Sequence, residues 1–158
     1  MASDQDLEQL SFTVSGFISK EISEVYEAVA DPEKLSSYFT TGGAKGRAET
    51  GETLTWDFHD FPGAFPVKVI EAQSPKKIVI QWGAEHTTSD NAMNTVTFDF
   101  TSVDNDTRTK VDITETSWQA TTDGAKAAFG NCMGWTGMMA AMKAWLEYGI
   151  NLREGFYK

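Results

Sequence analysis

The chain has 158 residues, of which 41% are hydrophobic, and its 13 basic and 23 acidic side chains give a formal net charge of −10. This length predicts one domain over residues 1–158 that folds without a metal or a disulfide. The acidic excess argues against nucleic-acid and anionic-membrane partners, which need clustered Lys and Arg. No apolar run could span a membrane, and the acidic start, MASDQDLEQL, is unlike a secretory signal. Together with a single cysteine, these features predict a cytoplasmic protein.

The first third of the chain predicts one strand and two short helices. Apolar and polar side chains alternate over Leu10–Ile18, which is typical of a half-buried strand. Ser19 is the expected cap of a helix that follows. Asp31-Pro32 then supplies an N-cap and a first helical residue for a second helix that ends near Phe39. Thr40–Gly51 is rich in Gly and Thr and is expected to be a loop with at most one weak strand.

The middle of the chain predicts a run of antiparallel strands. Each segment alternates in hydrophobicity, and Gly, Pro, Asn and Asp lie between the segments. The expected strands are Thr53–Phe58, Pro66–Ala72, Lys77–Trp82, Asn94–Thr101 and Thr107–Thr116.

The last forty residues change to a helical period. Apolar side chains recur every three or four residues at Cys132, Trp135, Met139, Met142 and Leu146. This stripe predicts one long amphipathic helix over roughly Thr122 to Arg153. A sheet with one apolar face and a long helix to cover it gives an α+β two-layer domain.

Three stretches resemble the START-like (SRPBCC) helix-grip superfamily, and most closely its branch related to the activator of the heat-shock-protein-ninety ATPase. They are ISKEISEVYEAVADPEKLSSYF, GETLTWDF with VIEAQSPKKIVIQW, and Gly134-Trp135 with WLEYGINLREG. Departures from the family pattern occur at Tyr26, Pro66 and Ser117. The resemblance implies a curved antiparallel sheet around the C-terminal helix, with a cavity between them. Members of the superfamily include carriers of apolar ligands such as lipids, polyketide cyclases and dehydratases, and chaperone-associated domains in stress responses.

The expected cavity defines a set of candidate ligand-binding residues. Methionines cluster on the last helix, and their flexible side chains suit an adaptable pocket, although packing in a solid core explains them equally well. Gly130, Gly134 and Gly137 favour a cavity or a close approach of helix and sheet, because Gly inside a helix costs about 1 kcal/mol relative to Ala. The candidates are Trp56, Phe58, Val69, Glu71, Trp82, Phe98, Glu115, Trp135, Met139 and Met142.

Glu71 and Glu115 are the polar members of this set. Glu115 follows Val111 and Ile113 at the strand period of two, and Glu71 follows Val67 and Val69 in the same way. A carboxylate on the concave face needs hydrogen bonds, a partner or water. It could orient a ligand or move a proton. The simpler alternative is that each strand ends there and the side chain reaches solvent.

Other chemistry has weak support in the sequence. His59 and His86, the only histidines, are expected at the ends of different strands, whereas a metal site needs three or four ligands that converge. No cofactor motif is present in the sequence. Cys132 is expected to be a buried structural thiol rather than a nucleophile.

We therefore rank three functions. The first is non-catalytic binding of a small apolar or amphipathic molecule between sheet and helix. The second is a polyketide cyclase or dehydratase-like enzyme, and the third is an interaction domain with a chaperone as partner. Binding ranks above catalysis because only Glu71 and Glu115 are evident titratable groups for the cavity, so no catalytic residue is assigned.

Overall fold

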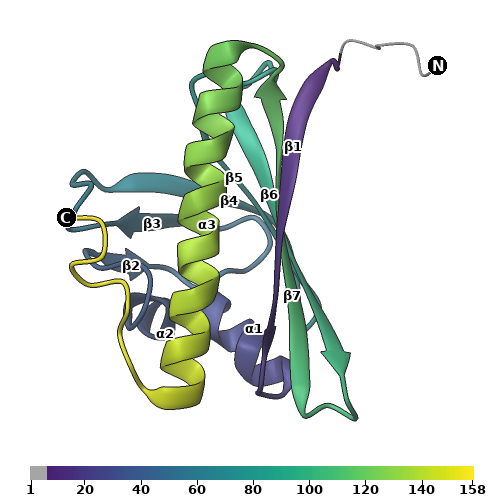
Figure 1. Cartoon of the computed structure of the whole chain (residues 1–158), viewed down its shortest axis with the longest axis vertical. Coiled ribbons are helices and arrows are strands. Elements are labelled where there is room, and N and C mark those ends of the chain that lie inside the picture. The colour runs from purple at the N-terminus through teal and green to yellow at the C-terminus, as the bar shows by residue number, and fades with distance from the viewer. Residues whose placement is uncertain (1–6) are drawn as a thin grey trace.

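The computed structural model describes residues 7–158, so most of the acidic start used for the localisation prediction lies outside it. Figure 1 shows the arrangement of its helices and strands. In chain order the elements are β1 (Gln9–Ile18), α1 (Ile22–Ala30), α2 (Pro32–Ser36), β2 (Gly43–Lys45), β3 (Thr53–Asp57), β4 (Phe65–Gln73), β5 (Lys77–Gly83), β6 (Met93–Val103), β7 (Arg108–Gln119) and α3 (Thr122–Tyr148).

All seven strands form one antiparallel sheet in the order β1-β7-β6-β5-β4-β3-β2. Each strand from β2 to β7 pairs with the next strand in the sequence. The first strand, β1, pairs with the last, β7. The long helix α3 runs across one face of the curved sheet, while α1 and α2 lie near one end of α3 (Figure 1). This arrangement confirms the predicted α+β helix-grip architecture. Within residues 7–158, no helix combines the length and apolar character needed to cross a bilayer.

Alternating burial along the strands explains why the sheet has one apolar face. In β6 the buried side chains are Asn94, Val96, Phe98 and Phe100, at every second position. In β7 the same period buries Val111, Ile113 and Glu115. Of the two alternatives for Glu115, an inward carboxylate or a solvent-exposed side chain at a strand end, the structure shows the inward one.

The short helices begin differently from each other. Asp31 caps α2 as predicted, because its Oδ1 accepts a hydrogen bond from Glu33 N at 2.9 Å and Pro32 is the first helical residue. The prediction that Ser19 caps α1 is wrong. The N-cap is Glu21, whose side chain makes no capping hydrogen bond.

Helix α3 begins where the sequence predicts, but it ends earlier. Thr121 is the N-cap and accepts a hydrogen bond from Gly124 N at 3.0 Å. The predicted end near Arg153 is wrong, because Gly149 adopts the left-handed conformation (φ 69°) and stops the helix after Tyr148. Residues 150–158, the C-terminal segment, then turn back alongside α3 toward β3 (Figure 1).

Candidate functional site: an aromatic pocket backed by a buried carboxylate

A pocket of about 470 Å³ lies between α3, the sheet and the C-terminal segment. Its wall is mainly aromatic. The aromatic lining residues are Phe39, Phe58, Phe61, Phe65, Trp82, Trp135 and Tyr157. Trp82 and Trp135 have ring centroids 5.2 Å apart, and Phe39 lies 5.8 Å from Trp135. Such connected rings form a rigid apolar surface that suits a flat or apolar ligand.

Glycines of α3 leave the helix side of the pocket open. Gly130 and Gly134 line the pocket, and a Cβ added at either position would meet no atom within 4 Å. A Cβ at Gly137, one turn further on, would instead collide with the hydroxyl of Tyr157. These contacts agree with the expectation of a cavity or a close approach. Two of the glycines face empty space, and the third makes room for the C-terminal segment.

Behind the two tryptophans lies the carboxylate of Glu115, which has 0% exposed area. Four side chains donate hydrogen bonds to it. They are Trp82 Nε1 (3.0 Å), Asn94 Nδ2 (3.3 Å), Asn131 Nδ2 (3.1 and 3.3 Å) and Trp135 Nε1 (2.9 Å). A carboxylate only accepts hydrogen bonds, so this set of donors matches it. Trp82, Asn131 and Trp135 also line the pocket, which links the buried charge to the pocket wall.

The charge of Glu115 also orients its neighbours. Asn94 turns its Nδ2 toward Glu115, and its Oδ1 is left buried without a partner in the described part of the chain. Among residues 7–158, no Lys or Arg forms an ion pair with Glu115. The negative charge is therefore held by neutral donors alone.

The structure divides the ten predicted site residues into three groups. Phe58, Trp82 and Trp135 line the pocket, and Glu115 lies behind it. Five others are buried in the core outside the pocket lining: Trp56, Val69, Phe98, Met139 and Met142. Glu71 lies apart from the pocket, is half-buried, and accepts a hydrogen bond from Gln73 Nε2.

Glu71 differs from Glu115 because a bulge interrupts the pairing of β4 with β5 between Val69 and Glu71. A bulge adds one residue and shifts the inward positions by one. Accordingly, Ala72 packs against the core in place of Glu71.

Several lining residues were not among the predicted set. They are Phe39, Phe61, Phe65, Gly130, Asn131, Met133, Gly134, Arg153 and Tyr157. The helical glycines gave a signal that could have moved the predicted cavity toward the first half of α3. Asn131, Arg153 and Tyr157 had no local signal.

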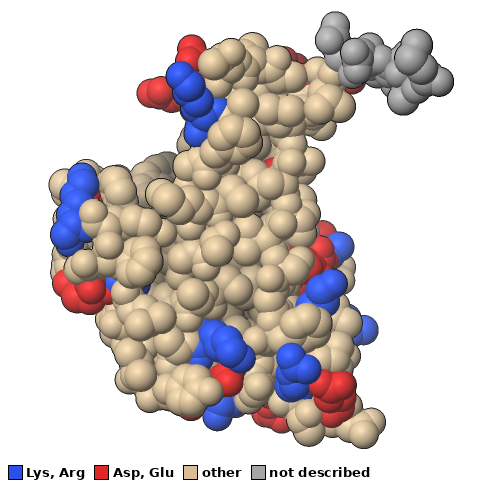
Figure 2. All heavy atoms as spheres, in the orientation of Figure 1, with Lys and Arg blue, Asp and Glu red and all other residues tan. Residues whose placement is uncertain are grey.

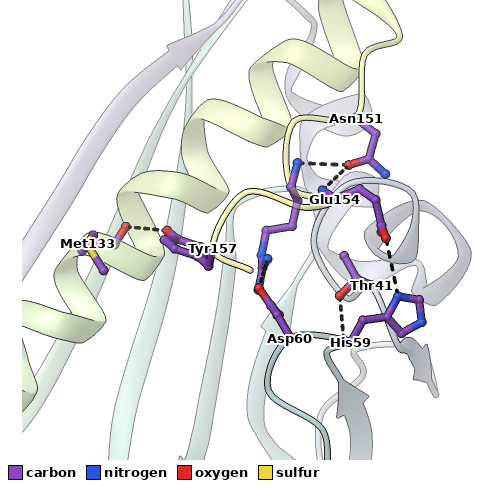
Figure 3. A network of polar contacts seen from close by, with 8 residues as sticks. Thr41, His59, Asp60, Met133, Asn151, Glu154 and Tyr157 are labelled. Atoms are coloured by element: carbon purple, nitrogen blue, oxygen red, sulfur yellow. Dashed lines mark hydrogen bonds and ion pairs between the residues drawn. The ribbon is translucent and has the colours of Figure 1, made fainter.

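Figure 3 shows Tyr157 of the C-terminal segment near Met133 of α3, and Glu154 of the same segment near His59. Arg153 of this segment lines one side of the pocket. Its guanidinium donates to both oxygens of Asp60, at 2.6 and 2.9 Å, and the two side chains are only 6% and 8% exposed. The guanidinium also lies over the rings of Tyr157 and Phe58, 4.8 and 5.4 Å from their centroids. Asn151 Oδ1 accepts from the backbone N–H of Arg153 at 3.0 Å, which fixes the turn.

The hydrogen bond from Arg153 holds the pKa of Asp60 below its ordinary value of 3.8. A carboxyl whose folded pKa is lowered stabilises the fold above its unfolded pKa, and that contribution is lost as the pH falls through the folded value. We therefore expect the attachment of the C-terminal segment to be constant from pH 7 to about pH 4 and to weaken only below 3.8. The ring signals of Tyr157 in NMR spectra measure this attachment. Equal attachment of an Asp60→Asn variant and the parent at pH 7, or release already near pH 5, would contradict the prediction.

His59, His86 and Cys132 are not part of the lining of the aromatic pocket. His59 is 67% exposed, with Nδ1 3.8 Å from Glu154 Oε1. No group of three His, Cys, Asp or Glu side chains in residues 7–158 is arranged to hold a metal. Cys132 is half-buried rather than fully buried as predicted, because it lies at the edge of the apolar stripe of α3.

The face of the molecule over α3 carries few charged side chains, although the whole chain is strongly acidic. Despite the net charge of −10, Figure 2 shows a broad face over α3 and beside it with few charged atoms, and most charged side chains lie toward its rim. Large apolar side chains are exposed at Phe61 and Met133, which line the pocket, and at Phe129, which precedes the lining residue Gly130 on α3.

Fold and pocket together define a helix-grip domain with an apolar pocket between its sheet and long helix. A family model described as "Activator of Hsp90 ATPase homolog 1-like protein" matches residues 20–147. The chain therefore belongs to this family. The comparison with curated proteins found no match.

The solved structures that share the fold include the following three. Protein SSP2350 from Staphylococcus saprophyticus is 22% identical, over 91% of this chain and 96% of its own, with a TM-score of 0.76. Aha1 from Colwellia psychrerythraea, solved as a dimer, is 21% identical over 89% and 98%, with a TM-score of 0.73. DynU16, a putative protein in the dynemicin biosynthetic locus, is 20% identical over 88% of this chain and 48% of its own, with a TM-score of 0.70. At these identities the likeness shows the fold alone.

Proposed function

We propose that this protein binds a small apolar or amphipathic molecule in the aromatic pocket and does not transform it. The observation that carries the proposal is a pocket of about 470 Å³ whose helix side is left open by Gly130 and Gly134. Gly inside a helix costs about 0.5–1 kcal/mol relative to Ala. Empty space beside two such residues is expected when the space serves a ligand.

The position of Glu115 favours binding over catalysis. A general base must lie within hydrogen-bond reach of its substrate. The carboxylate of Glu115 has no exposed area and already accepts from four side chains. A ligand in the pocket therefore meets the aromatic rings and Asn131 before it could meet Glu115.

The first test uses a neutral fluorescent probe, N-phenyl-1-naphthylamine, whose emission rises in apolar surroundings. We expect the parent protein to bind it and Gly134→Phe to lose at least about tenfold in affinity, because the new ring fills the pocket. Gly134→Ala should remain folded and gain up to about 1 kcal/mol in unfolding free energy, since its Cβ meets no atom. Fluorescence titration and urea unfolding measure the two effects.

A matched control lies on the same helix. Ala140 is exposed and does not line the pocket, so Ala140→Phe should leave probe binding unchanged. Absence of probe binding by the parent, or equal binding by Gly134→Phe, would refute the proposal. Native mass spectrometry of protein purified without added ligand would show directly whether a small molecule is retained.

A second candidate function is docking to a protein partner such as a chaperone. It is supported by the family's description and by the exposed apolar side chains Phe61, Phe129 and Met133. Substituting Phe129 by Ser would weaken such docking. The same change should leave probe binding intact, because Phe129 does not line the pocket.

A further inference from the structure

The polar atoms around the pocket are mostly occupied by contacts within the protein. The indole N–H groups of Trp82 and Trp135 donate to Glu115. Arg153 directs both terminal nitrogens at Asp60, and the Tyr157 hydroxyl donates to the backbone oxygen of Met133 at 3.4 Å. Among these side chains, Asn131 has the polar atom that is left for a ligand.

The side chain of Asn131 has a fixed orientation. Its Nδ2 lies 3.1 and 3.3 Å from the two oxygens of Glu115. Because a carboxylate only accepts, the amide NH₂ must face it, and the amide oxygen faces the other way. Asn131 Oδ1 accepts no hydrogen bond from any residue of 7–158, and the residue lines the pocket. Asn131 therefore brings to the pocket lining a hydrogen-bond acceptor that no described residue uses.

The charges near the pocket act against an anionic ligand. Arg153 and Asp60 cancel each other as a buried pair. Glu115 leaves one negative charge behind the wall, held by neutral donors. Like charges repel strongly where water is excluded, and the negative faces of the aromatic rings add to this effect.

From these observations, and resting on the proposed function, we infer that the pocket selects neutral aromatic molecules that carry an O–H or N–H donor. The donor binds Asn131 Oδ1, and Glu115 acts as a positioning residue that holds the amide in the accepting orientation. The aromatic rings of Phe39, Trp82 and Trp135 supply the apolar contact. Fatty acids and other carboxylates are disfavoured.

Among the described residues that line the pocket, Arg153 is the one with a positive charge, and Lys158 lies just outside the lining with its Nζ 4.7 Å from the ring centroid of Phe61. Both terminal nitrogens of Arg153 already bind Asp60, and the rings of Phe58 and Tyr157 lie beside its guanidinium. Binding an anion would require breaking or sharing this pair. The test below makes that alternative a separate outcome.

The experiment compares three probes of one shape with the purified full chain by isothermal titration calorimetry. They are 2-naphthol, which has a donor, 2-methoxynaphthalene, which has only an acceptor, and 2-naphthoate, which is an anion at pH 7. We expect 2-naphthol to bind about three- to tenfold more tightly than 2-methoxynaphthalene, because one hydrogen bond contributes about that much to affinity. We expect 2-naphthoate to bind at least about tenfold more weakly than 2-naphthol, because its charge is repelled. If none of the probes binds, the proposed function fails. If they bind without this order, only the selectivity fails, and strongest binding of 2-naphthoate would assign the pocket to anions held by Arg153.

Two variants separate Asn131 from the rest of the wall. Asn131→Ala should abolish the preference for 2-naphthol over 2-methoxynaphthalene while changing the affinity for 2-methoxynaphthalene less than about twofold. Met133→Ala also alters the lining but removes no contact with Glu115, so it should shift both affinities alike and keep their ratio. A preserved ratio in Asn131→Ala would overturn the assignment. Should that variant fail to fold, the ratio measured on the parent still decides the selectivity.

Discussion

Replacing Glu115 by Ala is expected to lower the free energy of unfolding by about 3–5 kcal/mol, the largest effect of any single change proposed for this protein. The substitution leaves the N–H groups of Trp82, Asn94, Asn131 and Trp135 without their shared acceptor. Each unsatisfied buried donor costs about 1–3 kcal/mol, and water entering the space relieves part of that cost. Urea unfolding followed by tryptophan fluorescence measures the change.

Two further substitutions test the reason for this effect. Glu115→Gln keeps the shape and one acceptor oxygen but turns an NH₂ group toward other donors, so we expect an intermediate loss of about 1–3 kcal/mol. Glu71→Ala removes a carboxylate from the same kind of sequence position, yet Glu71 is only half-buried, and its loss should cost no more than about 0.5 kcal/mol. Equal effects of Glu115→Ala and Glu71→Ala would show that the buried hydrogen-bond cluster does not stabilise the fold.

These two glutamates also show how far strand periodicity predicts a site. The spacing of Val111, Ile113 and Glu115 allows an inward carboxylate or a solvent-exposed strand end, and the inward one is observed because β7 is regular up to that point. The same reasoning fails for Glu71, because the bulge after Val69 shifts the inward position. The sequence around that bulge has no glycine or proline to mark it.

The partners of Glu115 could not be predicted from any local pattern. Trp82 pairs directly with Asn94 across β5 and β6, and Val96 pairs with Glu115 across β6 and β7. This register depends on the lengths and conformations of two turns, which hydrophobic alternation does not set. The apolar stripe predicts the buried face of α3 correctly. That face contacts both the solid core around Met142 and the pocket beside Gly134. Periodicity gives the direction of a side chain, not whether space remains beside it.

The C-terminal segment illustrates a second limit. Amphipathic spacing extends the helix to Arg153, whereas the left-handed Gly149 ends it and lets the chain fold back. Arg153 then reaches Asp60, which is 93 residues away in the sequence. Only the assembled fold brings these two charges together.

Replacing Arg153 by Leu is expected to release the C-terminal segment and to lower the free energy of unfolding by about 1–3 kcal/mol. Removing one partner of a buried pair leaves a buried charge, which costs about 3–5 kcal/mol if nothing moves. Here residues 150–158 can leave the surface, so Asp60 regains water and the loss stays smaller. Hydrogen–deuterium exchange should therefore rise in residues 150–158 and stay unchanged in α3.

The matched control is Arg47, which also binds a carboxylate through two nitrogens, at 2.6 and 2.7 Å from Glu27. That pair is exposed, at 42% and 30%, so Arg47→Leu should cost less than about 1 kcal/mol. In the double variant Asp60→Asn with Arg153→Leu, the free energy of unfolding should stay within about 0.5 kcal/mol of that of Arg153→Leu, because Asp60 already regains water once the segment is released. If Arg153→Leu costs no more than Arg47→Leu and exchange in residues 150–158 does not rise, the buried pair does not hold the segment. The wall of the pocket at Tyr157 would then depend on the aromatic contacts of the segment alone.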